Sequence, residues 1–329
     1  MRKLRNAVFG IALGDALGSR AQRKNFTATM SNYGDEEFSD LDDSLAITEH
    51  TESGLYLVKA LSTIYDPTVP VSSQRTIMAE YIARSYIDWK NETAGRGHRD
   101  RASIQALNKL ENLLADNIGS TNFFGGAASA SKSSQPMIRS LWLGILHAKG
   151  MLTDGELEEL CTLQTAVTHT NPTVIHASFI SAIVLSGLYT EYIQPGEIQH
   201  YLTKLCISRD EDYGWSEIFH ALENILELET SQVFMFEDIE DPATVLGAEN
   251  NVETTLAHAV MIADALYPDP NAALKRGVLN GGASGSISSL AGAWIGAMNR
   301  TNVWSGLEHV LTEPYREDLE VITDYLSSI

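Results

Sequence analysis

The stretch Gly281-Gly282-Ala283-Ser284-Gly285-Ser286, which precedes an apolar segment near the C-terminus, is the most informative part of the chain. Paired glycines before a helix allow another backbone to approach closely, and the first N–H groups of the helix can face an anion. The segment that follows, residues 287–298, mixes bulky apolar residues with alanines and glycines. Because such small residues let a second helix pack closely, we expect this segment to form a central helix of the molecule.

Two segments far upstream carry related features. The run Gly10-Ile11-Ala12-Leu13-Gly14-Asp15-Ala16-Leu17-Gly18 spaces its glycines by four residues and contains one carboxylate. The stretch Phe38-Ser39-Asp40-Leu41-Asp42-Asp43-Ser44-Leu45-Ala46 contains adjacent carboxylates. The apolar residues after Asp42 and Asp43 predict a helix that enters the core with its acidic start near a cleft, where carboxylates are suitable Mg²⁺ ligands. A solvated acidic helix start is the alternative interpretation.

Composition and charge limit the classes of partner. The chain has 329 residues, is 44% hydrophobic, and carries a formal net charge of −20 from 43 acidic and 23 basic residues. This charge argues against sequence-independent binding of nucleic acid and against an anionic membrane surface, because both need a basic face. An anionic ligand would need local compensation from metal ions, helix N-termini or backbone N–H groups.

Cysteine content and the first residues bear on the compartment. The two cysteines, Cys161 and Cys206, make neither a disulfide framework nor a metal-type spacing. The basic start and the apolar residues 7–13 imitate a signal peptide, but Gly14-Asp15 interrupts the apolar run. We therefore expect a cytoplasmic protein.

Helical periodicity dominates the chain. Apolar residues recur at three- and four-residue steps in several segments, among them residues 76–89, Arg101–Ala115, 216–228 and Val252–Leu266. Thr153-Asp154-Gly155-Glu156 has the spacing of a capping box, and Asn171-Pro172 is suited to begin another helix. Strand signals are weak. The sequence predicts an all-α fold, with residues 1–329 in a single compact multi-helix domain.

Two further features have both a structural and a functional interpretation. The stretch 119–135 is rich in small residues and includes Gly125 and Gly126. It is either a mobile surface loop or a segment that closes over a ligand. His169, in Thr168-His169-Thr170-Asn171-Pro172, is more typical of a structural hydrogen-bonding residue than of a catalyst, because a catalytic histidine needs a positioned partner.

Taken in order, the three segments resemble the fingerprint of the ADP-ribosylglycohydrolase (ADP-ribosyl-acceptor hydrolase) family. That fingerprint is Gly-Asp-Ala-Leu-Gly, then Thr/Ser-Asp-Asp-Thr/Ser, then Gly-Gly-Asp-x-Asp-Thr/Ser. Three shorter segments are also similar to family sequences: Ser134-Gln135-Pro136-Met137-Ile138-Arg139, Ala166-Val167-Thr168-His169 and Asn251-Val252-Glu253-Thr254-Thr255-Leu256. The resemblance covers roughly residues 5–298 and implies an all-α ADP-ribosylglycohydrolase-like domain.

The resemblance implies a hydrolase that uses a binuclear Mg²⁺ site to cleave the bond between ADP-ribose and a side chain. By position, Asp42 and Asp43 match catalytic metal ligands, and Ser286 matches the hydroxyl ligand of the last motif. Three of the six motif ligand positions hold residues that cannot ligate: Leu41, Ala283 and Gly285. Because two cations about 4 Å apart need several carboxylates to offset their repulsion, we expect one Mg²⁺ rather than two.

The resemblance also implies that ADP-ribose or an ADP-ribosylated protein is the partner. The substrate-binding positions that it implies are Asp15, Gly125, Gly126, Ser134, Met137, His169, Gly282 and Ser284.

Three hypotheses about activity follow. The chain is a hydrolase with a reduced magnesium site, or an inactive relative that binds ADP-ribose or a partner protein in an immunity or regulatory role. In the third hypothesis an inactivating Asp→Ala replacement accounts for Ala283, but it leaves Leu41 and Gly285 unexplained. The sequence does not specify the oligomeric state.

Overall fold

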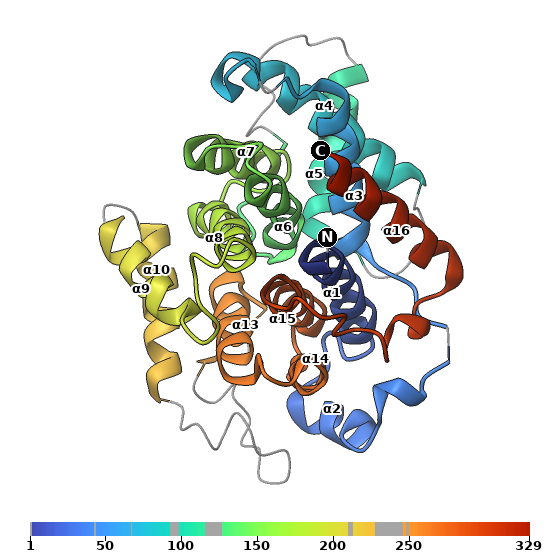
Figure 1. Ribbon diagram of the computed structural model, residues 1–329. Coiled ribbons are helices and arrows are strands. Elements are labelled where there is room, and N and C mark those ends of the chain that lie inside the picture. Colours follow the sequence, from blue (N-terminus) through green and yellow to red (C-terminus); the bar gives the residue numbers. More distant parts are fainter. Residues whose placement is uncertain are drawn as a thin grey trace.

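A computed structural model describes residues 2–42, 44–66, 68–92, 99–115, 127–209, 213–227, 246–247 and 250–329 (Figure 1). In chain order the helices are α1 (Arg2–Ser19), α2 (Phe26–Tyr33), η1 (Phe38–Asp40), α3 (Glu49–Ile64), α4 (Val71–Glu92), α5 (Arg101–Ala115), α6 (Gln135–Ala148), α7 (Asp154–Ala166), α8 (Pro172–Tyr189), α9 (Ile198–Ser208), α10 (Tyr213–Glu223), η2 (Asn224–Glu227), α13 (Val252–Leu266), α14 (Pro270–Leu279), α15 (Ser284–Met298), η3 (Glu308–Val310) and α16 (Glu313–Ser328). These ranges contain isolated β-bridges but no strand. The expected all-α fold is confirmed.

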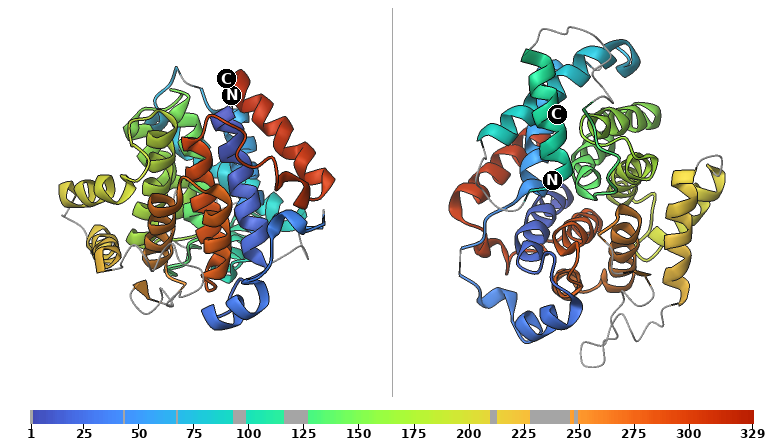
Figure 2. Two further views of the ribbon diagram at one scale, coloured as in Figure 1. Left: turned by 60° about the horizontal axis from the view of Figure 1, so that its bottom comes forward. Right: turned by 180° about the vertical axis from the view of Figure 1, so that it is seen from behind.

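Helices α1 and α15 pack against each other at the centre of the molecule (Figure 2). Their small residues meet in antiparallel register, Gly10 against Gly292, Gly14 against Ser288 and Gly18 against Ser284. A Cβ atom on Gly14 would lie 2.2 Å from the carbonyl oxygen of Ser288, which is far inside contact distance. The glycines are therefore needed because the two backbones touch, as the density of small residues predicted.

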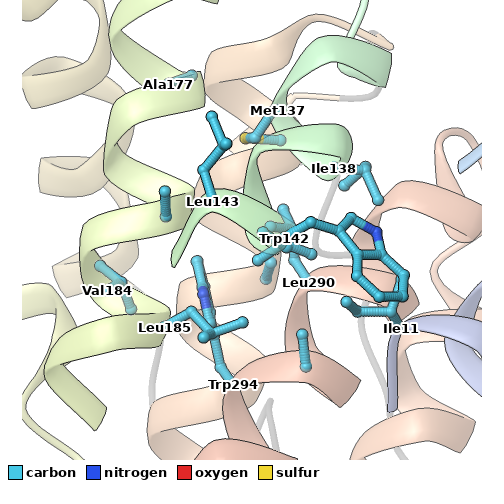
Figure 3. Close-up of a cluster of buried hydrophobic side chains, with 14 of the residues drawn as sticks. Ile11, Met137, Ile138, Trp142, Leu143, Ala177, Val184, Leu185, Leu290 and Trp294 are labelled. Carbon is cyan, nitrogen blue, oxygen red and sulfur yellow. The ribbon is translucent and has the colours of Figure 1, made fainter. Parts of the chain in front are cut away.

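The apolar core continues from this pair into α6 and α8 (Figure 3). Trp142 of α6 and Trp294 of α15 are fully buried, and the Trp294 Nε1 donates to the carbonyl of Ser181 in α8 at 3.2 Å. Within the described ranges α8 is the one helix long and apolar enough to cross a membrane, but most of it is buried inside the molecule. Its apolar surface is that of a core helix.

Several predicted helices form as expected. The Thr153 hydroxyl accepts from the Glu156 N–H at 3.3 Å, and the Glu156 carboxylate accepts from the Thr153 N–H at 3.0 Å, which completes the capping box of α7. Asn171 caps α8 by accepting from the N–H groups of Thr173 and Val174. Helices α5 and α13 have the predicted bounds.

The helix expected directly after Asp42 and Asp43 does not form. Leu45 instead pairs with the C-terminal region, since its N–H donates to Val310 at 3.0 Å and its carbonyl accepts from Thr312 at 3.1 Å. Helix α3 begins only at Glu49. The reason lies in α1, whose Asp15 supplies hydrogen-bond acceptors for the N–H groups at this later start.

Candidate functional site

Asp15 fixes the N-terminus of α3. Its carboxylate accepts from the N–H groups of Thr48 and Thr51 at 2.7 and 3.1 Å, and from the hydroxyl groups of both threonines. Asp15 is fully buried, so these four contacts replace the water that a carboxylate would otherwise need. Asp15, the one acidic residue of α1, thereby positions the two side chains between the threonines, Glu49 and His50.

Glu49 and His50 line a cavity of about 240 Å³ at which several helices begin. The cavity is also lined by residues at or next to the first turns of four other helices, Asp100 of α5, Ser134 of α6, Asn251 of α13, and Ala283 and Ser286 of α15. Gln22, Arg23 and Lys132 are among the other polar residues of its wall. Helix N-termini carry partial positive charge, so these helix starts add positive potential to a cavity that also contains the carboxyl groups of Glu49 and Asp100.

A chain of hydrogen bonds crosses the cavity floor. The Ser134 and Ser286 hydroxyl oxygens lie 2.8 Å apart, and the Ser286 hydroxyl oxygen lies 3.3 Å from His50 Nε2. The absence of a side chain at Gly285 leaves room for the imidazole, because a Cβ there would lie 3.1 Å from His50 Cδ2 and Nε2. Burial of His50 lowers the pKa of its imidazole, so the ring is neutral at pH 7.

The two acidic side chains of the cavity are already engaged. Glu49 is 4% exposed and accepts from the backbone N–H of Asp100. Burial and, secondarily, the nearby Asp100 charge raise the pKa of Glu49 well above its usual range. The Asp100 carboxylate accepts from the Ser103 N–H of α5 at 2.7 Å. Its other neighbour is His169, whose Nε2 lies 3.6 Å away.

His169 lies behind Asp100 and does not line the cavity. The residue is fully buried, and its Nδ1 forms a 3.0 Å hydrogen bond with the Thr168 hydroxyl. Burial, partly offset by Asp100, lowers the pKa of His169 to about 4. His169 therefore supports the cavity wall as a neutral hydrogen-bonding residue.

Of the site residues expected from the sequence, the structure brings Ser134 and Ser286 to the cavity. Asp42 is exposed and does not line it, while Asp43, Gly125 and Gly126 lie outside the described residues. The remaining candidates have structural contacts.

Those contacts differ in kind. Met137 of α6 is packed in the hydrophobic core of the protein (Figure 3). The Ser284 hydroxyl donates to the carbonyl of Gly18 at 2.7 Å. Gly282 has a positive φ of 55° and donates its N–H to the carbonyl of Lys24 at 2.8 Å. Gly282 and Ser284 therefore join the last motif to the first helix and the loop after it.

The described donors do not fit a pair of magnesium ions. Across the described ranges, no three histidine, cysteine or acidic side chains are grouped so as to hold a metal ion. The cavity offers two carboxylates, Glu49 and Asp100, and each accepts a backbone N–H. Mg²⁺ prefers several oxygen ligands in octahedral geometry, and an imidazole is a poor substitute.

The whole chain is similar to known proteins. A family model described as ADP-ribosylglycohydrolase matches residues 1–328. A solved structure titled "ADP-ribosylglycohydrolase-related protein complex" has 18% sequence identity and a TM-score of 0.66, with 99% of this chain and 96% of that chain covered. At this identity the likeness shows a common fold. A search of curated proteins gives no match.

The start of α3 also follows the order of the family's second motif. Thr48-Glu49-His50-Thr51 keeps the two flanking hydroxyl residues and has Glu and His in place of the two aspartates. Sequence reasoning missed this segment because it followed the acidic pair; the paired threonines were the available signal. In this segment Thr51 contacts Asp15 of the first motif, and His50 contacts Ser286 of the third. With a matching family model over nearly its full length, the chain belongs to the ADP-ribosylglycohydrolase family.

Proposed function

We propose that this chain is a family member that binds an ADP-ribosyl group without Mg²⁺ and does not hydrolyse its ribosyl bond. The observation that supports this most is the packing of His50 against Gly285. At the positions where the family motifs have four aspartates, this chain has Glu49, His50, Ala283 and Gly285. The imidazole fills space next to the missing side chain, so the loss of ligands is accompanied by a repacked cavity.

The lining of the cavity supports a polar ligand. Hydroxyl, amide and cationic groups line it together with two carboxyl groups, and apolar surface is scarce. A volume of about 240 Å³ is below the usual range for a drug-sized ligand, so one end of an ADP-ribosyl group would enter and the rest would extend outward.

A hydrolase with a reduced magnesium site is the competing function. Family membership and the two cavity carboxylates, Glu49 and Asp100, favour it. In that case Glu49 would need to ionise and exchange its backbone hydrogen bond for a metal ion. Burial opposes this ionisation.

Two measurements separate the two functions. The first is calorimetric titration with ADP-ribose, in Mg²⁺ and again in EDTA, and the second is an assay for release of ADP-ribose from a modified protein. We expect equal affinity in both buffers and no release. Release that requires Mg²⁺ and is lost in Glu49→Gln would contradict the proposal. The matched control is Glu320→Gln, which changes the same side chain on the distant helix α16.

A further inference from the structure

The cavity combines features that suit a negative ligand group better than a cation. Helices α6 and α15 have 14 and 15 residues, and both start at its wall. Neither has a side-chain cap from its own N-cap residue, because the Ser134 hydroxyl bonds Ser286 instead and Ala283 has no side-chain oxygen. The side chains that accept from their first N–H groups are neutral: Gln22 Oε1 accepts from Gly285 at 2.9 Å, and Ser133 Oγ accepts from Gln135 at 3.4 Å. The partial positive charge of these two helix ends is therefore not offset by a capping carboxylate.

A buried side chain of the wall gives independent support for a ligand. His50 is 5% exposed, and its Nδ1 has no hydrogen-bond partner although Nε2 contacts Ser286. A buried ring nitrogen without a partner is costly, and the cost is removed when a ligand supplies the missing hydrogen bond. This unsatisfied group belongs to the wall formed by α3 and α15.

The charged groups of the wall also favour a negative ligand group. Arg23 contributes positive charge, while the Asp100 carboxylate is turned to the start of α5 and to His169. Lys132 pairs with Glu217 and Glu253 at 2.6 and 3.1 Å, which fixes its position beside the start of α13. Burial and the nearby Asp100 charge raise the pKa of Glu49, which disfavours a negative charge on this side chain.

We infer that a phosphate group of the ligand occupies this cavity between His50 and the N-termini of α6 and α15, where the family motifs would place cations. The inference rests on the proposed function and specifies how the site recognises its ligand. An oxyanion takes hydrogen bonds from helix N-termini, hydroxyl groups and an imidazole without a metal ion. The site of a cation-dependent family has thus become an anion site by loss of its aspartates.

Ala283 offers the sharpest test, because it lines the cavity and is the N-cap residue of α15. Ala283→Asp places a negative charge where the phosphate is expected, and aspartate is also a favoured N-cap, so the change should not unfold the helix. Ala283→Asn has the same shape and caps equally well without the charge. Arg23→Gln, at an exposed position, is a second variant with little effect on folding.

Affinities for inorganic phosphate, AMP, ADP-ribose and uncharged adenosine are measured by calorimetry in EDTA. We expect phosphate, AMP and ADP-ribose to bind and to compete with one another, and adenosine to bind much more weakly. Ala283→Asp should lose at least about tenfold in affinity for phosphate, whereas Ala283→Asn should stay within about threefold of the parent protein. Arg23→Gln should weaken phosphate binding by a smaller factor.

The outcomes distinguish this inference from the proposed function. Equal phosphate affinity in Ala283→Asp and Ala283→Asn, or no phosphate binding at all, would overturn the phosphate site even if ADP-ribose still binds. Phosphate binding that is sensitive to Ala283→Asp, together with metal-dependent release of ADP-ribose, would support the phosphate site and overturn the proposed function.

Discussion

His50 and Gly285 are two departures from the family motif that fit each other. One adds a ring, the other removes a side chain, and the ring edge lies where a Cβ atom of residue 285 would be 3.1 Å away. An aspartate placed at position 285 alone would therefore be forced against the His50 imidazole.

Gly285→Asp should lower the free energy of unfolding by about 1–3 kcal/mol, because the new side chain is forced against the imidazole. In the His50→Ala background the same change should cost at least about 1 kcal/mol less, since the ring is absent. Urea denaturation of the four proteins of this double-mutant cycle measures the coupling. Effects that add within about 0.5 kcal/mol would show that the two residues are independent.

At this scale the sequence predicted part of the site. Ser134 and Ser286 were identified because they belong to segments similar to the family, and both line the cavity. The acidic pair at Asp42 drew attention because carboxylates define a metal motif. The pair of acidic residues was a weaker indicator of the site than the two threonines, Thr48 and Thr51. Their hydroxyl groups donate to Asp15 and so position Glu49 and His50 at the cavity.

The element that determines the architecture is the contact between α1 and α15. The glycine spacing in each helix predicted a close approach, and periodicity predicted α5 and α13 to the residue. The start of α3 was not predictable in the same way, because it depends on a carboxylate from α1 that is 33 residues away from Thr48. Tertiary hydrogen bonds override local preference at that point.

Gly14→Ala tests the close contact of the two helices. The added methyl group would lie 2.2 Å from the backbone of Ser288, and backbone cannot turn aside as a side chain can. We expect a loss of about 3 kcal/mol or more in the free energy of unfolding, despite the better helix propensity of alanine.

Gly155→Ala is the matched control for this prediction. Gly155 also lies inside a helix, α7, but an added Cβ meets no atom within 4 Å. The control should be neutral or stabilising by up to about 1 kcal/mol. If thermal and urea denaturation give similar values for both variants, the two central helices are not in close contact.

For the molecule as a whole, the net charge does not describe the surroundings of the cavity, where several helix N-termini meet. A charge of −20 gave no indication of the anion site that we infer. The residues that line the cavity are spread along the sequence from Gln22 to Ser286. Neither hydrophobic periodicity nor motif spacing predicts that such distant positions lie together. Composition describes the average surface, whereas the cavity depends on where helices begin. Helix starts are the feature that single-sequence analysis locates least well.

Acid stability is a property of the whole fold, and His258 of α13 allows it to be tested. Its Nε2 forms a hydrogen bond with the carbonyl of Gly247 at 3.2 Å, and burial lowers the pKa of the ring to about 4 from an ordinary 6.5. Between these values the unfolded chain binds a proton that the folded chain does not. The contribution is therefore complete above pH 6.5 and is lost as the pH falls through 4, a change of about 3 kcal/mol.

His258→Gln keeps a donor for Gly247 but does not titrate. Falling pH also reduces the net negative charge and its self-repulsion, so the parent protein alone does not isolate the histidine. The difference in unfolding free energy between parent and variant, measured by urea denaturation at several pH values from 7 to 4, removes this shared effect. We expect that difference to shift by about 3 kcal/mol in favour of the variant as the pH falls. Parallel curves would mean that His258 is already accessible to protons in the folded state.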